Sequence, residues 1–352
     1  MIQPKLLKLF SPGYRDLRHG VHCRAHRRQI LALVCILGLG IAEPVLNPPA
    51  AQACFFWQAC ARARGEASNT RAGGKRTGRI VGGNDASIPY VISPRNAWIQ
   101  QPSAAEPYTI RWNPVEGARR YTVRIWRWTL ERDRPETVLW EETTADATNY
   151  LLFPPLVPLE LGNYYSIQVV TDTGMSSDLD EGYYESGFQL LFEEDYEQLR
   201  SQLEMLVPTE TTLTNGEPTE ETTLARAGIF FLEEMYADAL ALLQSLADSP
   251  TASDLVYTAL GDTYSQSGLN QLAIDAYSQA LALSIDNSDL LSEAVIRVNL
   301  ANVYATLGLF DDTLQHLRQA RDIYKQLEEE AEIIRLERRI EIISARLLRQ
   351  RE

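Results

Sequence analysis

The stretch from Leu255 to Leu283, LVYTALGDTYSQSGLNQLAIDAYSQALAL, decides the fold of this chain. Small and aromatic residues follow one another there in a fixed order: Tyr257, Leu260, Gly261, Tyr264, Gly268, Ala273, Tyr277 and Ala280. Gly261 and Ala273 lack bulk, so two antiparallel helices can approach closely, and Tyr264 and Tyr277 fill the space beside them. Gly268 permits a tight turn between the helices. The stretch therefore predicts a helix–turn–helix hairpin.

This order of residues resembles the tetratricopeptide (TPR) repeat, a helical hairpin of about 34 residues. Such a hairpin cannot bury its apolar face alone, so neighbouring hairpins must stack on it. The same template fits 34 positions upstream and 40 positions downstream, with matching residues at Ala227, Phe230, Ala239, Ala301, Tyr304, Gly308 and Ala320. The resemblance implies three stacked hairpins over residues 220–328, a solenoid that binds other proteins and does not catalyse.

The last segment, residues 329–352, has its own helical pattern. Apolar residues recur there at spacings of three and four, at Ile333, Leu336, Ile340, Ile343 and Leu347. Two interpretations are open: a helix that caps the last repeat, or a coiled coil that dimerises the chain. The apolar seam covers about two heptads, fewer than coiled coils usually need, which favours the capping helix.

The middle of the chain, residues 88–192, reads as short strands separated by turns. The strongest are Tyr108–Trp112, Tyr121–Trp128, Thr137–Glu142, Tyr164–Thr171 and Phe188–Phe192. In Tyr121–Trp128 apolar residues alternate with polar ones, so one face of the strand is expected to be buried. A short amphipathic helix from Glu193 to Leu206 and a Thr/Glu-rich linker follow, together covering residues 193–219.

The strand region resembles a fibronectin type III domain. The resemblance rests on Trp112–Ala118 (WNPVEGA), on Tyr121 and Val123, and on the pattern of Leu159, Gly162, Tyr165, Ile167 and Val169. In that family the tyrosine of the last pattern bonds back to the backbone at a strand corner, which implies a structural role for Tyr165. The sequence thus predicts a multidomain all-β plus all-α protein, a fibronectin III-like β-sandwich followed by a TPR α-solenoid.

The first 53 residues predict a secretory signal peptide. Seven Lys and Arg residues precede an apolar run over residues 30–42, and Ala51-Gln52-Ala53 is a small-x-small cleavage pattern. We therefore expect export to the periplasm, the envelope or the extracellular space. An uncleaved signal anchor and a lipoprotein with lipidated Cys54 remain alternatives, and membrane contact is expected only in those two forms.

Residues 54–87 predict a basic disordered linker, because they are rich in Gly and Arg and poor in large apolar residues. From Ile80 onward the chain is acidic, with 44 Asp and Glu against 20 Lys and Arg, which argues against a nucleic-acid partner. Cys54 and Cys60 either pair as a disulfide in an oxidising compartment or stay unpaired.

Two motifs suggest chemistry and fail closer inspection. Arg79–Gly83 (RIVGG) matches the activation site of trypsin-like proteases, but the chain after residue 53 has one histidine, His316, in an expected helix, and no GDSGG-like serine. The acidic loop around Asp172, Asp178, Asp180 and Glu181 does not have EF-hand spacing and is expected to be solvated. We expect no enzyme activity, no cofactor and no metal site.

The functional prediction is an exported, non-enzymatic scaffold that holds a protein or peptide in the concave TPR groove. By alignment to the central repeat, the groove-facing residues are Thr258, Asp262, Gln266, Asn299 and Asn302. Their amide and carboxylate groups suit an extended peptide backbone or a basic segment. The alternative is a cell-envelope module whose β-sandwich binds glycan by stacking on Trp126 and Trp128, two residues on the strand face opposite the expected core.

Overall fold

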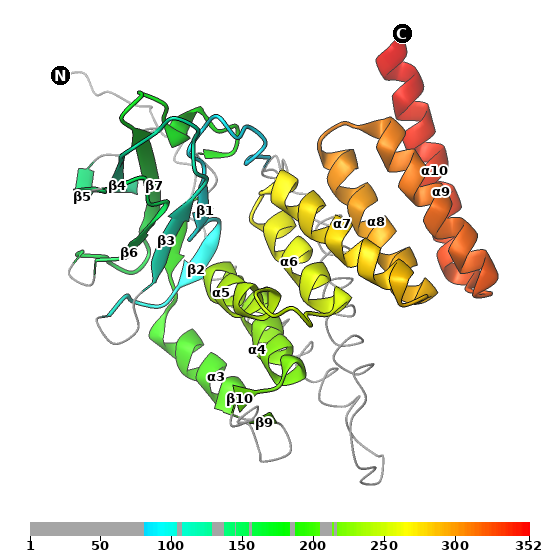
Figure 1. Ribbon diagram of the computed structural model, residues 1–352, viewed down its shortest axis with the longest axis horizontal. Coiled ribbons are helices and arrows are strands. Elements are labelled where there is room, and N and C mark those ends of the chain that lie inside the picture. The colour runs from blue at the N-terminus through cyan, green and yellow to red at the C-terminus, as the bar shows by residue number, and fades with distance from the viewer. Residues whose placement is uncertain are drawn as a thin grey trace, which may run out of the picture. The chain divides into compact units, whose positions relative to one another are not determined.

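The computed structural model describes residues 81–103, 108–128, 137–144, 146–154, 157–183, 187–204, 213–214 and 217–352 (Figure 1). All of them belong to one compact unit, Ala53–Glu352. The predictions for the signal peptide, for residues 54–80 of the linker, and for Cys54 and Cys60 lie outside the described residues. Among the described helices, none combines the length and the apolar character that crossing a bilayer requires.

The first described half consists of β-strands in two sheets. One sheet has the order β1 (Val91–Ser93), β3 (Thr109–Trp112), β6 (Tyr150–Leu152). The other has the order β2 (Ala97–Ile99), β8 (Phe188–Leu190), β7 (Tyr164–Thr171), β4 (Tyr121–Trp128), β5 (Thr137–Thr143). All neighbours are antiparallel except β2 and β8, which run parallel. A short 3₁₀ helix, η1 (Ser177–Leu179), follows β7.

The two sheets share one hydrophobic core. Ile110 and Trp112 from β3 are fully buried in it together with Val123 and Ile125 from β4. The alternation expected along β4 is present in its first six residues, because Tyr121, Val123 and Ile125 are buried and the residues between them are not. The sequence missed β1, β2 and β6, which are each three residues long and too short to show a period.

Tyr165 has the structural role that the resemblance implied. Its side chain is fully buried, and its hydroxyl donates to the backbone carbonyl of Glu160 and accepts from the Glu160 N–H. The phenol therefore fixes the corner that leads into β7.

The second half is a row of helices that begins with α3 (Glu193–Glu204), followed by the two-residue strands β9 (Leu213–Thr214) and β10 (Glu217–Pro218). Leu199 on α3 is buried against Ile229 and Met235 of the helical region, so this helix packs on the first hairpin, as its apolar face predicts. Three antiparallel hairpins follow: α4 (Glu220–Leu232) with α5 (Tyr236–Ala247), α6 (Asp254–Gln266) with α7 (Asn270–Asp286), and α8 (Leu290–Thr306) with α9 (Phe310–Gln326). The row ends, within the described residues, at α10 (Glu330–Arg351).

Close approach of paired helices depends on a small residue in the first helix of each hairpin. A Cβ added to Gly261 would lie 2.5 Å from the ring of Tyr277. Ala301, 40 positions later, is fully buried at the equivalent place in α8. The same 40-residue step leads from Val256 to Ile296 and then to Leu336, all three fully buried. The helices α6, α8 and α10 therefore share one packing register.

The apolar seam of α10 packs on the preceding hairpin. Ile333, Leu336 and Ile343 are buried in a common core with α8 and α9, so the seam faces the preceding hairpin. A dimer through these residues would have to break that core.

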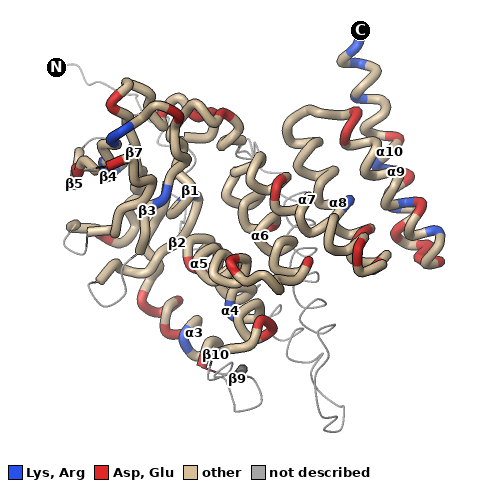
Figure 2. The backbone as a smooth tube through the Cα atoms, in the orientation of Figure 1, with Lys and Arg blue, Asp and Glu red and all other residues tan. Residues whose placement is uncertain are grey.

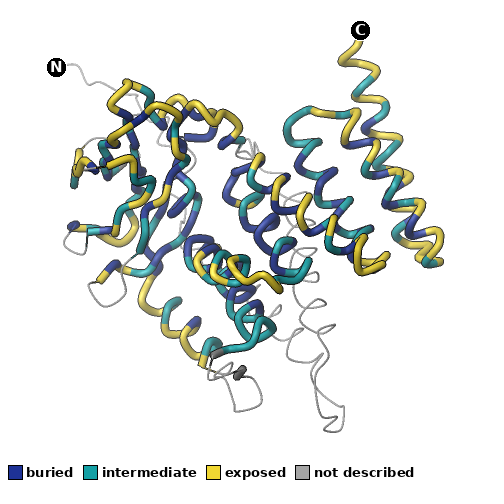
Figure 3. The backbone as a smooth tube through the Cα atoms, viewed as in Figure 1, coloured by how far each residue is buried: buried dark blue, intermediate teal, exposed yellow. Residues whose placement is uncertain are grey.

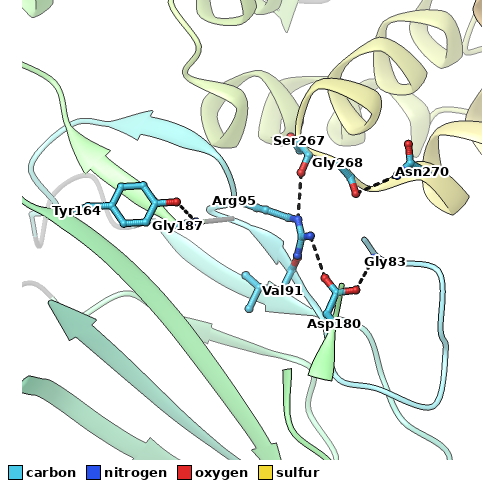
Figure 4. A network of polar contacts seen from close by, with 9 residues as sticks. All are labelled: Gly83, Val91, Arg95, Tyr164, Asp180, Gly187, Ser267, Gly268 and Asn270. Carbon is cyan, nitrogen blue, oxygen red and sulfur yellow. Dashed lines mark hydrogen bonds and ion pairs between the residues drawn. The ribbon is translucent and has the colours of Figure 1, made fainter. Parts of the chain in front are cut away.

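A buried ion pair joins the strands to the central hairpin (Figure 4). Arg95, between β1 and β2, is 2% exposed, and its guanidinium lies 2.9 Å from the carboxylate of Asp180. The same guanidinium donates to the backbone carbonyl of Ser267, in the turn between α6 and α7, and to that of Val91. Each guanidinium nitrogen thus has an acceptor in a place from which water is excluded, which is the condition for keeping a buried charge.

The segment Gly82-Gly83, which the sequence assigned to the end of the linker, completes this junction. The Gly83 N–H donates to the Asp180 carboxylate at 2.8 Å, and the Gly82 carbonyl accepts from the Asn270 N–H. A Cβ on Gly82 would lie 2.3 Å from a guanidinium nitrogen of Arg95. The chain can pass this close because Gly82 has no side chain.

We predict that Gly261→Ala destabilises the protein by about 1–3 kcal/mol, because the added methyl overpacks against Tyr277. In an open helix the same change would stabilise by up to about 1 kcal/mol, so the sign is diagnostic. Urea unfolding followed by circular dichroism measures the difference. In a Tyr277→Leu background the penalty should largely disappear; a penalty that persists there would contradict the steric explanation.

We also predict that Arg95→Met costs about 3–5 kcal/mol of unfolding free energy, because it leaves the Asp180 carboxylate buried without its cation. The matched control is Arg124→Met, which removes an exposed ion pair with Glu141 and should cost at most about 1 kcal/mol. Equal costs for the two variants in urea unfolding would show that burial of the Arg95 pair is unimportant.

Candidate functional site

Four polar side chains from α6, α8 and α10 form a row that we name the polar ladder: Asp262, Asn299, Asn302 and Arg339. The Asn299 amide donates to the Asp262 carboxylate at 3.2 Å, and the Arg339 guanidinium donates to the Asn302 amide oxygen at 2.6 Å. Both contacts span 37 positions, and the 40-residue register relates Asp262 to Asn302 and Asn299 to Arg339. The same pair of helix positions therefore meets twice along the row.

The structure assigns different environments to the five sequence-predicted groove residues. Thr258 and Asp262 are buried, at 5% and 7% exposure, Asn299 and Asn302 are half-buried, and Gln266 is exposed. The Thr258 hydroxyl donates to the Asp254 carbonyl within α6, and the Asp262 carboxylate also accepts from the Tyr277 hydroxyl on α7. Asp262 thus joins α6 to α7, whereas Thr258 bonds within its own helix, and a partner would reach the exposed and half-buried residues first.

Gln266 lies where the repeats meet the strands. Its backbone carbonyl accepts a hydrogen bond from the Asn96 side chain at 2.9 Å, next to the Arg95 junction. Asn299 and Asn302 belong to the ladder, but no contact in the described residues joins Gln266 to either of them. The structure thus brings Asp262, Asn299 and Asn302 together and leaves Gln266 at the edge of the strands.

Arg339 is the ladder residue that the sequence argument missed. The five groove residues predicted from the sequence include neither Lys nor Arg, and their groups suit an extended backbone or a basic segment. The signal was present, because the 40-residue step that relates the repeats leads from Asn299 to Arg339. With a guanidinium beside Asn302, the ladder has an acidic end at α6 and a basic end at α10.

A second junction between strands and repeats surrounds Tyr108. Its hydroxyl donates to the Asp238 carboxylate on α5 at 3.1 Å and accepts from the Gln100 N–H. Burial raises the pKa of Tyr108 well above its usual range, and the negative charge of Asp238 raises it further. The phenol therefore stays protonated and serves as a neutral link between the strands and the first hairpin.

Of the two tryptophans in the glycan alternative, the structure describes the side chain of Trp126 alone. Trp126 is half-buried on β4, and its indole N–H is buried without a hydrogen-bond partner there. The side chain of Trp128 lies outside the description. No observation favours sugar binding at this strand.

The acidic loop after β7 differs from the solvated loop that we expected. Asp180 is buried in the ion pair with Arg95, so the expectation is wrong for this residue. The carboxylate of Asp172 accepts from the Arg119 N–H, and that of Asp178 accepts from Gln168. Within the described residues, no cluster of three or more His, Cys, Asp or Glu side chains is arranged to hold a metal ion.

His316 lies on α9, in a helix as expected, and is half-buried. Its ring stacks on Tyr304, with centroids 5.4 Å apart and planes 12° from parallel. Burial lowers the pKa of His316, the positive charge of Arg297 lowers it further, and Asp312 opposes them. The imidazole is therefore held neutral as a packing group.

Comparison with known families agrees with this geometry. Residues 251–326 match the tetratricopeptide repeat family. The match covers the hairpins α6–α7 and α8–α9, and the family comparison found no catalytic family. No curated protein matches the chain. The tetratricopeptide region is thus a repeat array of the kind that binds protein partners.

We predict that His316 titrates below its ordinary value of about 6.5. Because the folded pKa is lowered, stability is lost as the pH falls through about 6.5, where the unfolded chain takes up the proton first. The test is the difference in unfolding free energy between wild type and His316→Phe, a variant that keeps the stack and removes the titration. The wild type should lose unfolding free energy relative to the variant as the pH falls from 7.5 to 5. A difference that does not change with pH would contradict the lowered pKa.

Proposed function

We propose that this protein is a non-enzymatic scaffold that binds a protein or peptide along the inner helices α6, α8 and α10 of its tetratricopeptide region. The observation that carries the proposal is the polar ladder, which joins α6 and α8 of the matched repeat region to α10 in one register. Surface polar groups repeated at one level per hairpin suit a partner with a repeating backbone.

The charges of the ladder specify how a partner would lie. The half-buried Asn302 and Arg339 offer an amide and a guanidinium, which together recognise a carboxylate or a backbone carbonyl. At the α6 end the Asp262 carboxylate already accepts two hydrogen bonds from this chain. An extended peptide with an acidic group toward α10 is therefore the partner that the ladder fits best.

The proposal includes two finer points. The strand region is a fibronectin III-like sandwich, supported by the strand orders β1-β3-β6 and β2-β8-β7-β4-β5 and by the Tyr165 contact. The scaffold acts outside the cytoplasm, supported by the signal-peptide pattern of residues 1–53.

The test is affinity capture from the exported fraction with three versions of the full chain: wild type, Arg339→Glu and Asn302→Ala. We expect both variants to capture at least about fivefold less of a shared set of proteins, because the ladder loses its donor to an acidic group. Arg318→Glu, an exposed charge reversal on α9 outside the ladder, is the matched control and should capture as wild type does.

Circular dichroism and thermal unfolding of each variant separate loss of binding from loss of folding. Capture that is identical for wild type, Arg339→Glu and Asn302→Ala, with all three folded, would exclude the ladder as the binding site.

A further inference from the structure

The outer side of α10 carries a stripe of six exposed residues that we name the end face: Ala331, Ile334, Arg338, Glu341, Ala345 and Leu348. They follow spacings of three and four, the period of a helix face that packs on another helix. Ile334 and Leu348 are 60% and 64% exposed, the least buried large aliphatic residues of this helix. The stripe is distinct from the seam of Ile333, Leu336 and Ile343 that packs on α9.

The end face occupies positions that α8 buries against neighbouring helices. Shifted back 40 residues, Ile334, Arg338 and Glu341 correspond to three residues of α8: Ala294, Val298 and Ala301. Those three are 0%, 8% and 0% exposed and share a core with α9 and α10. The equivalent surface of α10 has no described element beyond it (Figures 1 and 3). The end face is thus a helix-packing surface that carries Arg338 and Glu341 where α8 has Val298 and Ala301.

Because it carries both Arg338 and Glu341, the end face is complementary in charge to a second copy of itself. A second α10 can lie antiparallel on the end face in the register that places Arg338 of one copy opposite Glu341 of the other. In the same register Ile334 meets Ala345 and Leu348 meets Ala331, so each large side chain opposes a small one. A parallel arrangement would place Arg338 beside Arg338 and Glu341 beside Glu341.

We propose that two copies of this protein associate through α10, antiparallel, with the end face as a twofold symmetric interface. Each contact then occurs twice, as an isologous interface requires. Both Arg and Glu residues occur along α10, and an incoming apolar helix without matching charges would leave Arg338 and Glu341 desolvated and unpaired (Figure 2). The end face spans about two and a half heptads, so we expect a weak dimer with a Kd in the micromolar range.

A charge-swap series measured by sedimentation equilibrium tests the proposal on the full chain. Arg338→Glu places four carboxylates together in the dimer, and Glu341→Arg places four guanidinium groups together. Each single variant should weaken dimerisation at least about tenfold, because like charges meet. The double variant Arg338→Glu/Glu341→Arg restores opposite charges and should dimerise as wild type does.

A mixture of the two single variants should form the heterodimer, because every contact in it pairs Arg with Glu. Arg318→Glu on α9 is the control for a charge change outside the end face and should leave the association unchanged. Wild type that stays monomeric at 200 μM, or single variants that dimerise like wild type, would overturn the proposal. Monomeric wild type would leave the end face to a different protein, and unaffected single variants would point to a parallel pairing.

Discussion

The structure depends on how closely the two helices of each hairpin approach. Gly261 allows the Tyr277 ring to lie where a Cβ would otherwise be, and Ala301 has the same place one repeat later. From α6 through α8 to α10 the sequence keeps a constant step of 40 residues, and a given position on these helices meets the same neighbour position each time. The polar ladder and the end face are both consequences of that constant step.

The second constraint is electrostatic. Arg95 is buried away from water, and the desolvation cost of its guanidinium is offset by contacts with the Asp180 carboxylate and two backbone carbonyls. One of those carbonyls, Ser267, belongs to the turn that Gly268 makes possible, so the strand region is joined to the hairpin with the clearest repeat pattern. Gly82 and Gly83 then fill the remaining contacts to Asp180 and Asn270 without side chains of their own.

Local pattern determined what the sequence could predict. The helices from Asp254 to Gln326 have a strong period and small residues at fixed places, and β4 and β7 alternate over eight residues each. The contacts that the sequence missed join residues far apart. Arg95 and Ser267 are 172 positions apart, and the partners of Asp180 lie on other elements, so no local rule marks Asp180 as buried. Asp262 was expected to face a partner because its position in the repeat does, yet Tyr277 and Asn299 engage its carboxylate.

The exposed face of α10 must also avoid becoming a non-specific apolar contact surface. The equivalent positions of α8, Ala294, Val298 and Ala301, are apolar and covered by neighbouring helices. An exposed copy of that apolar surface would bind any apolar face, including the opposite end of another solenoid. Such head-to-tail contacts do not close and can grow into fibres. Arg338 and Glu341 make that outcome unfavourable, because an apolar partner would bury both charges without a counter-ion. An antiparallel copy of α10 pairs each of them with an opposite charge. The aliphatic residues Ile334 and Leu348 remain on either side of this pair, so the end face keeps enough apolar surface to bind and enough charge to select what binds.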